Sequence, residues 1–211
     1  MNIPIITSAP IRYQIGDHDL YDSFDLVSRG EMTASLQENA SSIVRDYQFD
    51  FPVEKIQTIF IAEKGQTLDT AKLLIETGRS PRAAIISLPE LNGIRFSMQN
   101  LIPKDAFARL SHDQAMRTAR EQFIIQLFNN RLTESLASVK ARMKSLIEML
   151  RERENALCIS HGFYVKLLQV YVGSPHAFTE LEALQKAFEP DERPYQPLQG
   201  FTLTNTTEIR A

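Results

Sequence analysis

Short apolar runs alternate with segments of helical periodicity along this 211-residue chain, and this alternation limits its fold more than any other feature. Four runs are short enough for strands and rich in aliphatic residues, at 3–7, 59–62, 83–86 and 156–159. Helical spacing is predicted at 28–47 (with Ser28 as a cap), 67–77, 162–173 and in two helices between 111 and 150. Strands separated by helices usually form a parallel sheet covered on both faces. The pattern predicts a three-layer α/β/α sandwich with a mostly parallel central sheet.

One segment interrupts the alternation after the third strand. From residue 90 the chain has an Asn92-Gly93 turn, a proline at 103 and mixed polarity, which is typical of an insertion that covers part of a sheet. We expect this helical insertion to extend to about residue 130. A short helix at 179–188 and a last strand at 201–203 complete a single predicted domain over 1–211.

Composition argues against several classes of protein. The net charge of −3 and scattered basic residues disfavour nucleic-acid binding. Cys158 is the only cysteine, so an internal disulfide and a cysteine-based zinc site are excluded, and we expect no metal and no cofactor. No run of about 20 apolar residues and no secretory signal is present, so we expect no membrane partner and a cytoplasmic location.

The most distinctive short motif is Ser160-His161-Gly162. It places a histidine at the carboxyl end of a predicted parallel strand, immediately before a helix. Ligands bind at this position in open α/β sheets, and the free N–H groups of the helix favour anions such as phosphate. A histidine that caps the helix or is satisfied in the core is the alternative interpretation.

Several motifs in the same order resemble those of one known family. They are spread over most of the chain and comprise Leu26-Val27 with Gly30 and Ala34, Thr70-Ala71, Leu88-Pro89-Glu90-Leu91, Glu134-Ser135 with Val139 and Arg142, and the final run Leu157 to Gly162. Together they resemble the histidine phosphatase superfamily, which includes the cofactor-dependent phosphoglycerate mutases. The resemblance implies a phosphoglycerate mutase-like fold with His161 as the second catalytic histidine.

The resemblance also implies a site that lacks most of its charged groups. The family surrounds the transferred phosphoryl group with an Arg-His pair after strand one, an arginine after strand two and a second histidine, while a carboxylic acid protonates the leaving oxygen. In this sequence the Arg-His-Gly position falls on Ser8-Ala9-Pro10, the loop arginine falls on Gln66, and the acid position is matched by Glu90. Because Ala9 cannot form a phosphohistidine, the resemblance implies a pseudoenzyme that binds a phosphorylated small molecule or a protein partner.

Alternatives remain open at this stage. A rival alignment on 26–31 also lacks the histidine and leaves 3–7 without a role. A relocated nucleophile would have to be His18, Ser8 or Cys158, although a solvated His18 and a buried Cys158 are the simpler interpretations. A purely structural module with a vestigial pocket is a further alternative. Arg95 could also lend charge, whereas His112 and His176 indicate nothing specific. The residues expected around a bound phosphate are Ser8, Arg12, Gln66, His161 and Gly162.

Overall fold

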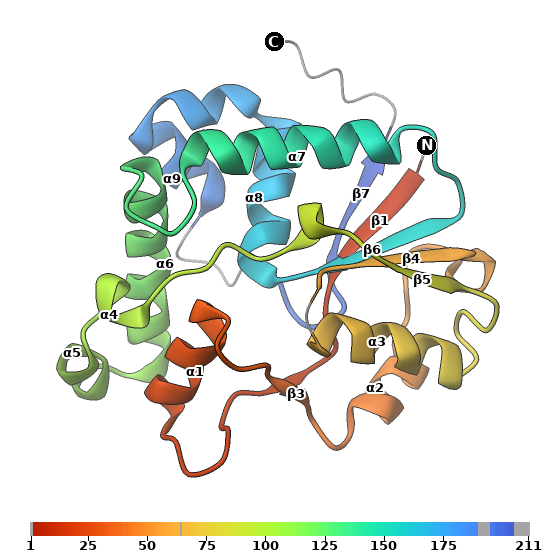
Figure 1. The fold of residues 1–211 in the computed structure, drawn as a ribbon, viewed down its shortest axis with the longest axis horizontal. Helices are drawn as coiled ribbons and strands as arrows, with labels where there is room; N and C mark the ends of the chain where they lie inside the picture. The colour runs from red at the N-terminus through yellow and green to blue at the C-terminus, as the bar shows by residue number, and fades with distance from the viewer. Residues whose placement is uncertain (1, 64, 190–194, 205–211) are drawn as a thin grey trace.

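The computed structural model describes residues 2–63, 65–189 and 195–204, and its centre is a five-stranded sheet (Figure 1). The strands are β1 (Asn2–Thr7), β4 (Thr58–Ile61), β5 (Ala84–Ser87), β6 (Ala156–Ser160) and β7 (Gly200–Thr204), in the order β5-β4-β6-β1-β7. Every pairing is parallel except that of β7, which runs antiparallel to β1. The prediction of a mostly parallel sheet is therefore confirmed.

Helices cover both faces of this sheet, which confirms the predicted layers. Alternate residues of β6 point in opposite directions, as in any strand. Leu157 and Ile159 pack with one buried cluster that includes residues of α2 (Ala40–Asp46) and α3 (Gly65–Glu76). Cys158 packs with the other cluster, which includes residues of α7 (Leu136–Leu150) and α8 (Gly162–Gly173). Three further helical elements are η1 (Val53–Lys55), η3 (Pro175–Thr179) and α9 (Leu181–Phe188).

Helix α7 illustrates how the sequence pattern becomes packing. Its apolar residues recur at helical spacing on one face, and those that are buried are Val139, Met143, Leu146, Ile147 and Leu150. Each such side chain contributes about 1.5–3 kcal/mol when fully buried. The Ser135 hydroxyl caps the helix by accepting a hydrogen bond of 3.1 Å from the Ser138 N–H.

The single helix expected over 28–47 is wrong. The structure has α1 (Leu20–Arg29) and α2, separated by β3 (Ser35–Leu36), which pairs antiparallel with β2 (Ile11–Arg12), a strand that precedes α1, to form a two-stranded ribbon. Asp19, not Ser28, caps α1, and Gly30 ends this helix in a left-handed conformation at φ 76°. Glycine adopts that conformation without steric cost and so stops the helix. The later apolar positions of the pattern belong to the ribbon and to a separate helix.

The segment after β5 is helical, as expected for the insertion. It contains η2 (Pro89–Leu91), α4 (Met98–Leu101), α5 (Lys104–Arg109) and α6 (His112–Phe128). Ser111 and Gln114 form a capping box at the start of α6. Figure 1 shows α4, α5 and α6 beside α1, at one end of the sheet. Among the residues described, no helix combines the length and the apolar character that crossing a membrane requires.

Candidate functional site

A cavity of about 480 Å³ opens at the carboxyl ends of the central parallel strands. Its floor is formed where β1, α3 and α8 meet, and it brings together Ser8, Ala9, Gln66, His161 and Gly162. The volume suits a small molecule, since ligand pockets commonly measure about 300–1,000 Å³. Ser8, Gln66, His161 and Gly162, four of the five residues expected around a phosphate, thus lie in one place. Arg12, in β2, is exposed and is not part of the cavity lining.

His161 is engaged by Gln66 at this floor. The amide Nε2 of Gln66 lies 3.0 Å from Nδ1 of the ring. The Gln66 amide can donate to an unprotonated Nδ1 or, when turned over, accept from a protonated one, so this contact holds the ring in either tautomer. The His161 side chain makes no capping hydrogen bond to α8, all of which is described, and the residue is only partly buried. His161 therefore occupies the N-cap position of α8 without capping it through its side chain, and it is not a core histidine.

The segment after β1 is fixed by neutral groups. Ala9, which is 1% exposed, donates its N–H to Oγ1 of Thr70 at 2.9 Å. The Thr70 hydroxyl donates in turn to the carbonyl of Gln66 at 2.7 Å, so a single threonine joins this segment to the start of α3. The Ser8 carbonyl accepts from the Leu198 N–H at 3.2 Å. The positions at which the family resemblance calls for charge thus have ordered neutral contacts.

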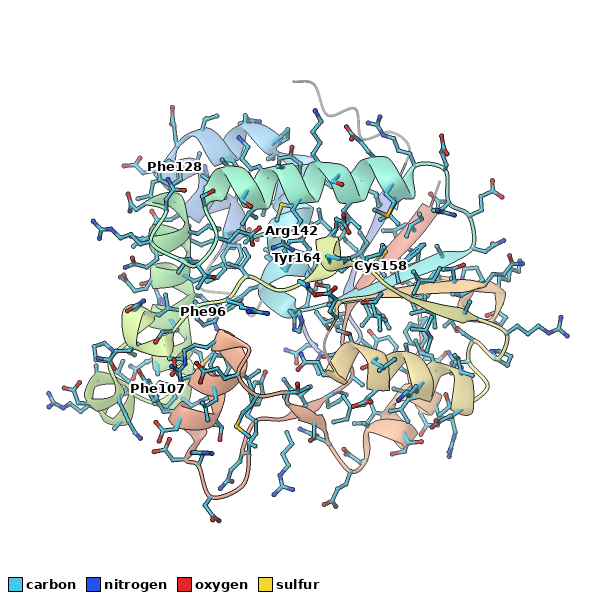
Figure 2. The ribbon with its side chains drawn as sticks, in the orientation of Figure 1. Phe96, Phe107, Phe128, Arg142, Cys158 and Tyr164 are labelled. Atoms are coloured by element: carbon cyan, nitrogen blue, oxygen red, sulfur yellow. The ribbon has the colours of Figure 1, made fainter. Side chains whose placement is uncertain are left out.

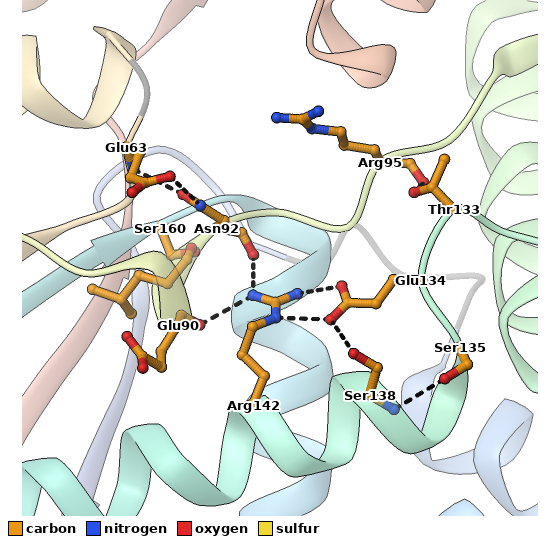
Figure 3. A network of polar contacts seen from close by, with 11 residues as sticks. Glu63, Glu90, Asn92, Arg95, Thr133, Glu134, Ser135, Ser138, Arg142 and Ser160 are labelled. Atoms are coloured by element: carbon orange, nitrogen blue, oxygen red, sulfur yellow. Dashed lines mark hydrogen bonds and ion pairs between the residues drawn. The ribbon is translucent and has the colours of Figure 1, made fainter.

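Charged side chains reach the cavity from other directions. Arg95, Asp113 and Arg120 contribute to the lining, together with His112. Figure 3 shows the exposed Arg95 side chain directed away from the neighbouring polar network, while its carbonyl accepts from Oγ1 of Thr133 at 2.7 Å. Arg95 was a possible source of charge in the sequence.

Arg120 and His112 were missed as cavity residues. Arg120 is only 6% exposed, so this guanidinium is held within the wall of α6. A signal existed, because Arg120 follows Met116 by four residues and precedes Phe123 by three, on the apolar face of a helix. His112 is the first residue of α6 and carried no comparable signal.

Glu90, the expected acid, lies outside the cavity lining, next to a buried arginine. Arg142 donates from Nη1 to the carbonyl of Glu90 at 3.1 Å and to that of Asn92 at 2.5 Å. Its Nη2 and Nε pair with the Glu134 carboxylate at 2.7 and 3.0 Å, a two-pronged ion pair visible in Figure 3. The guanidinium also lies 4.6 Å from the centre of the Tyr164 ring (Figure 2). We call Arg142, Glu134 and the two carbonyls the Arg142 cluster.

The Arg142 cluster holds a loop against His161. Asn92 also pairs with Glu63, donating from Nδ2 to the carboxylate at 2.9 Å and accepting the Glu63 N–H at 2.8 Å (Figure 3). The next residue, Gly93, lies so close to the histidine that a Cβ there would sit 2.9 Å from Cδ2 of the ring. Only glycine permits this approach. The position of the imidazole is thereby fixed from above by the loop and from the side by Gln66.

The other candidate groups lie elsewhere. His18 and His176 are exposed and do not line the cavity. Cys158 is buried in β6, where burial raises the pKa of its thiol and leaves it unreactive, as the simpler interpretation held (Figure 2). The rival motif at 26–31 lies at the end of α1, not after a strand. Within the described part of the chain, no cluster of three or more His, Cys, Asp or Glu side chains is placed to hold a metal.

Comparisons with known proteins give matches among solved structures only. No family model matches the sequence, and no curated protein matches it. A putative alpha-ribazole-5'-P phosphatase from Escherichia coli str. K-12 substr. MG1655 is similar with a TM-score of 0.51 and 14% identity, over 82% of this chain and 79% of that one. A protein described as mycobacterial hydrolase 2 gives 0.50 and 15%, over 81% and 71%. A phosphoglycerate mutase from Bacillus anthracis str. Sterne gives 0.49 and 12%, over 82% and 80%. At such identities likeness to the first two shows the fold alone, an α/β fold with a mostly parallel central sheet.

Proposed function

We propose that the cavity beside His161 binds a phosphorylated ligand and does not hydrolyse it through a phosphohistidine. The observation that carries this proposal is the 3.0 Å contact between the Gln66 amide and Nδ1 of His161, in an open cavity. A neutral amide stands where the resemblance calls for a guanidinium, and Ala9 stands where it calls for the nucleophile. The fold supports phosphate chemistry, since the similar E. coli protein is itself described as a putative phosphatase.

Binding of an anion is supported by donors that converge on the floor. The amino-terminal ends of α3 and α8, each of 12 residues, lie at Gln66 and Gly162. First-turn N–H groups lack partners within their helix and favour anions by about 0.3–1 kcal/mol per helix. The imidazole of His161 is a further polar group at the floor, and Arg95 supplies positive charge at the wall. With neutral hydrogen bonds worth about 0.5–1.5 kcal/mol each, we expect affinity for phosphate alone in roughly the millimolar range.

Absence of turnover follows from the groups at the floor. Ala9 stands where the resemblance calls for the nucleophile and cannot form a phosphohistidine, and Nδ1 of His161 is occupied by the Gln66 amide. Ser8 is the remaining hydroxyl among the expected floor residues, at 8% exposure, and an alcohol needs a general base to become a nucleophile. Glu90 lies outside the lining, so it does not supply the acid.

The test combines a phosphatase panel with a ligand screen on one preparation. Purified protein is incubated with 4-nitrophenyl phosphate and sugar phosphates, and its melting temperature is measured with phosphate, vanadate and the same esters. We expect no turnover above the blank and an upward shift that His161→Ala removes. Rapid turnover abolished by His161→Ala would refute the proposal.

Two other outcomes identify the alternatives. If activity is present and is lost in His18→Ala or Arg12→Ala, the protein is an enzyme with relocated groups, although both residues lie outside the cavity lining. If phosphate, vanadate and every ester leave the melting temperature unchanged, the cavity is vestigial and the protein is a structural module. A shift produced only by a phosphoserine or phosphohistidine peptide would instead assign a protein partner.

A further inference from the structure

The cavity has two unlike sides. The floor is polar and carries Ser8, Gln66 and His161. The wall formed by the segment after β2, α1 and the insertion carries apolar side chains beside the charged Arg95, Asp113 and Arg120. The wall residues used below are Tyr13, Phe24, Val27, Phe96, Phe107 and Met116. We call this set the aromatic wall. A ligand that fills the cavity must contact both sides.

The rings of the aromatic wall are already ordered. Tyr13 stacks on Phe24 with centroids 5.5 Å apart and planes 25° apart, although Tyr13 is 43% exposed. Phe96 is packed edge-on against Phe123 of α6 at 5.4 Å. Because such rings have few alternative rotamers here, a ligand ring can meet them at a small entropic cost.

Contacts between α1 and the insertion join the wall into one unit. The Tyr21 hydroxyl donates to the carbonyl of Ile102 at 2.9 Å. The Asp25 carboxylate accepts from the Met98 N–H at 2.6 Å and from the Ser97 hydroxyl at 3.0 Å. The two sides of the wall are thus held at a fixed spacing around the cavity.

We infer that the ligand is a phosphomonoester whose body is a flat aromatic or apolar group, with the phosphate at the His161 floor and the body against the aromatic wall. This inference rests on the proposed function and deepens it. A floor with few charges binds phosphate weakly, so most of the affinity must come from the body of the ligand. A sugar buries less apolar surface against the rings of the aromatic wall than a flat aromatic group does.

The inference is tested by calorimetric titration with four probes: 1-naphthyl phosphate, ribose 5-phosphate, inorganic phosphate and 1-naphthol. The two esters carry the same head group and differ in the body. We expect 1-naphthyl phosphate to bind at least about tenfold more tightly than ribose 5-phosphate, because one ring face is removed from water. We also expect 1-naphthol to bind more weakly than its ester.

Variants of the aromatic wall show which residues cause the difference in affinity between the two esters. Tyr13→Ala and Phe24→Ala should reduce affinity for 1-naphthyl phosphate and leave ribose 5-phosphate unchanged. Tyr13 is exposed, so its replacement does not threaten folding. Phe49→Ala is the matched control, because Phe49 is a partly buried ring outside this cavity, and it should leave both affinities unchanged.

Failure of this inference differs from failure of the proposed function. Equal affinity for the two esters, or no effect of the wall variants, overturns the aromatic assignment while phosphate recognition stands. Equal affinity for 1-naphthol and 1-naphthyl phosphate, or release of 1-naphthol by turnover, overturns the proposed function itself.

Discussion

The Arg142 cluster and the His161 floor lie on two sides of the same loop. The cluster contains an ion pair, whereas Gln66 and Ala9 at the floor are neutral. In the cluster, a guanidinium that is 16% exposed is satisfied by a carboxylate and two carbonyls. At the floor, a neutral amide and an alanine stand in an open cavity. Removing the charge of Arg142 would leave its partners unsatisfied, whereas Gln66 and Ala9 carry no charge to remove. The comparison predicts that the cluster controls stability and the floor controls binding.

The largest effect should follow from Arg142→Met. The variant leaves the Glu134 carboxylate, which is 22% exposed, and two loop carbonyls without their donor. Breaking a largely buried pair by removing one partner costs about 3–5 kcal/mol of unfolding free energy. Urea denaturation followed by circular dichroism measures the change.

Lys144→Met is the control on the same helix. Lys144 pairs with Glu148 at 4.0 Å with both side chains exposed, and such pairs contribute about 0–1 kcal/mol. If Arg142→Met were no more destabilising than Lys144→Met, the Arg142 cluster would contribute no more to stability than an exposed ion pair.

Gly93→Ala changes the loop residue that lies against the His161 ring, between the Arg142 cluster and the floor. A Cβ 2.9 Å from the His161 ring must displace either the loop or the imidazole, which we expect to cost about 1–3 kcal/mol and to weaken phosphate binding. Gly173→Ala has open space around its Cβ and should be close to neutral. Unfolding curves and phosphate titrations of both variants decide, and unchanged binding in Gly93→Ala would show that the loop does not position His161.

Prediction from sequence succeeded where burial requires apolar residues in a recognisable pattern. The apolar runs at β1, β4 and β6 could be identified because both faces of these strands are covered, whereas the run at β5 is aliphatic although this edge strand is largely exposed. The place of His161 at the floor could be predicted because ligands bind at the carboxyl ends of parallel strands, whereas Ser8 and Gln66 were assigned to it through the family resemblance.

Prediction failed where distant contacts decide. The helix expected over 28–47 is broken by Gly30 and by the β2–β3 ribbon, a pairing that spacing along the chain does not reveal. Arg12 lies in that ribbon, so its expected place beside the phosphate could not be checked before the ribbon was known. The Arg142 cluster was visible only as a resemblance, because its partners at 90 and 92 are some 50 residues away along the chain.

Gln66→Glu sharpens the comparison at the floor with an almost isosteric change. A carboxylate beside His161 repels a phosphate dianion, so affinity should fall about tenfold or more, near 1.4 kcal/mol. Gln48→Glu, at an exposed position outside the cavity, should not alter binding. Titration with 1-naphthyl phosphate measures the difference, and equal affinity in Gln66→Glu and wild type would remove the floor from the binding site.

The smallest effect is expected at Lys104, whose ammonium lies 2.8 Å from Asp19 and 2.7 Å from Asp22 on the surface of the aromatic wall. The hydrogen bond from the Asp22 N–H and then that from Lys104 lower the pKa of Asp19 below its usual 3.8. A lowered folded pKa means that the stabilisation is present above the unfolded value and is lost as pH falls through the folded one. Lys104→Met should therefore lower Tm by about 1–2 °C at neutral pH, less in high salt, and not at all in strong acid. Thermal melts from pH 7 to pH 2 test this. If Lys104→Met destabilised the protein as much as Arg142→Met, burial would not explain why the fold depends on one charged side chain and not on another.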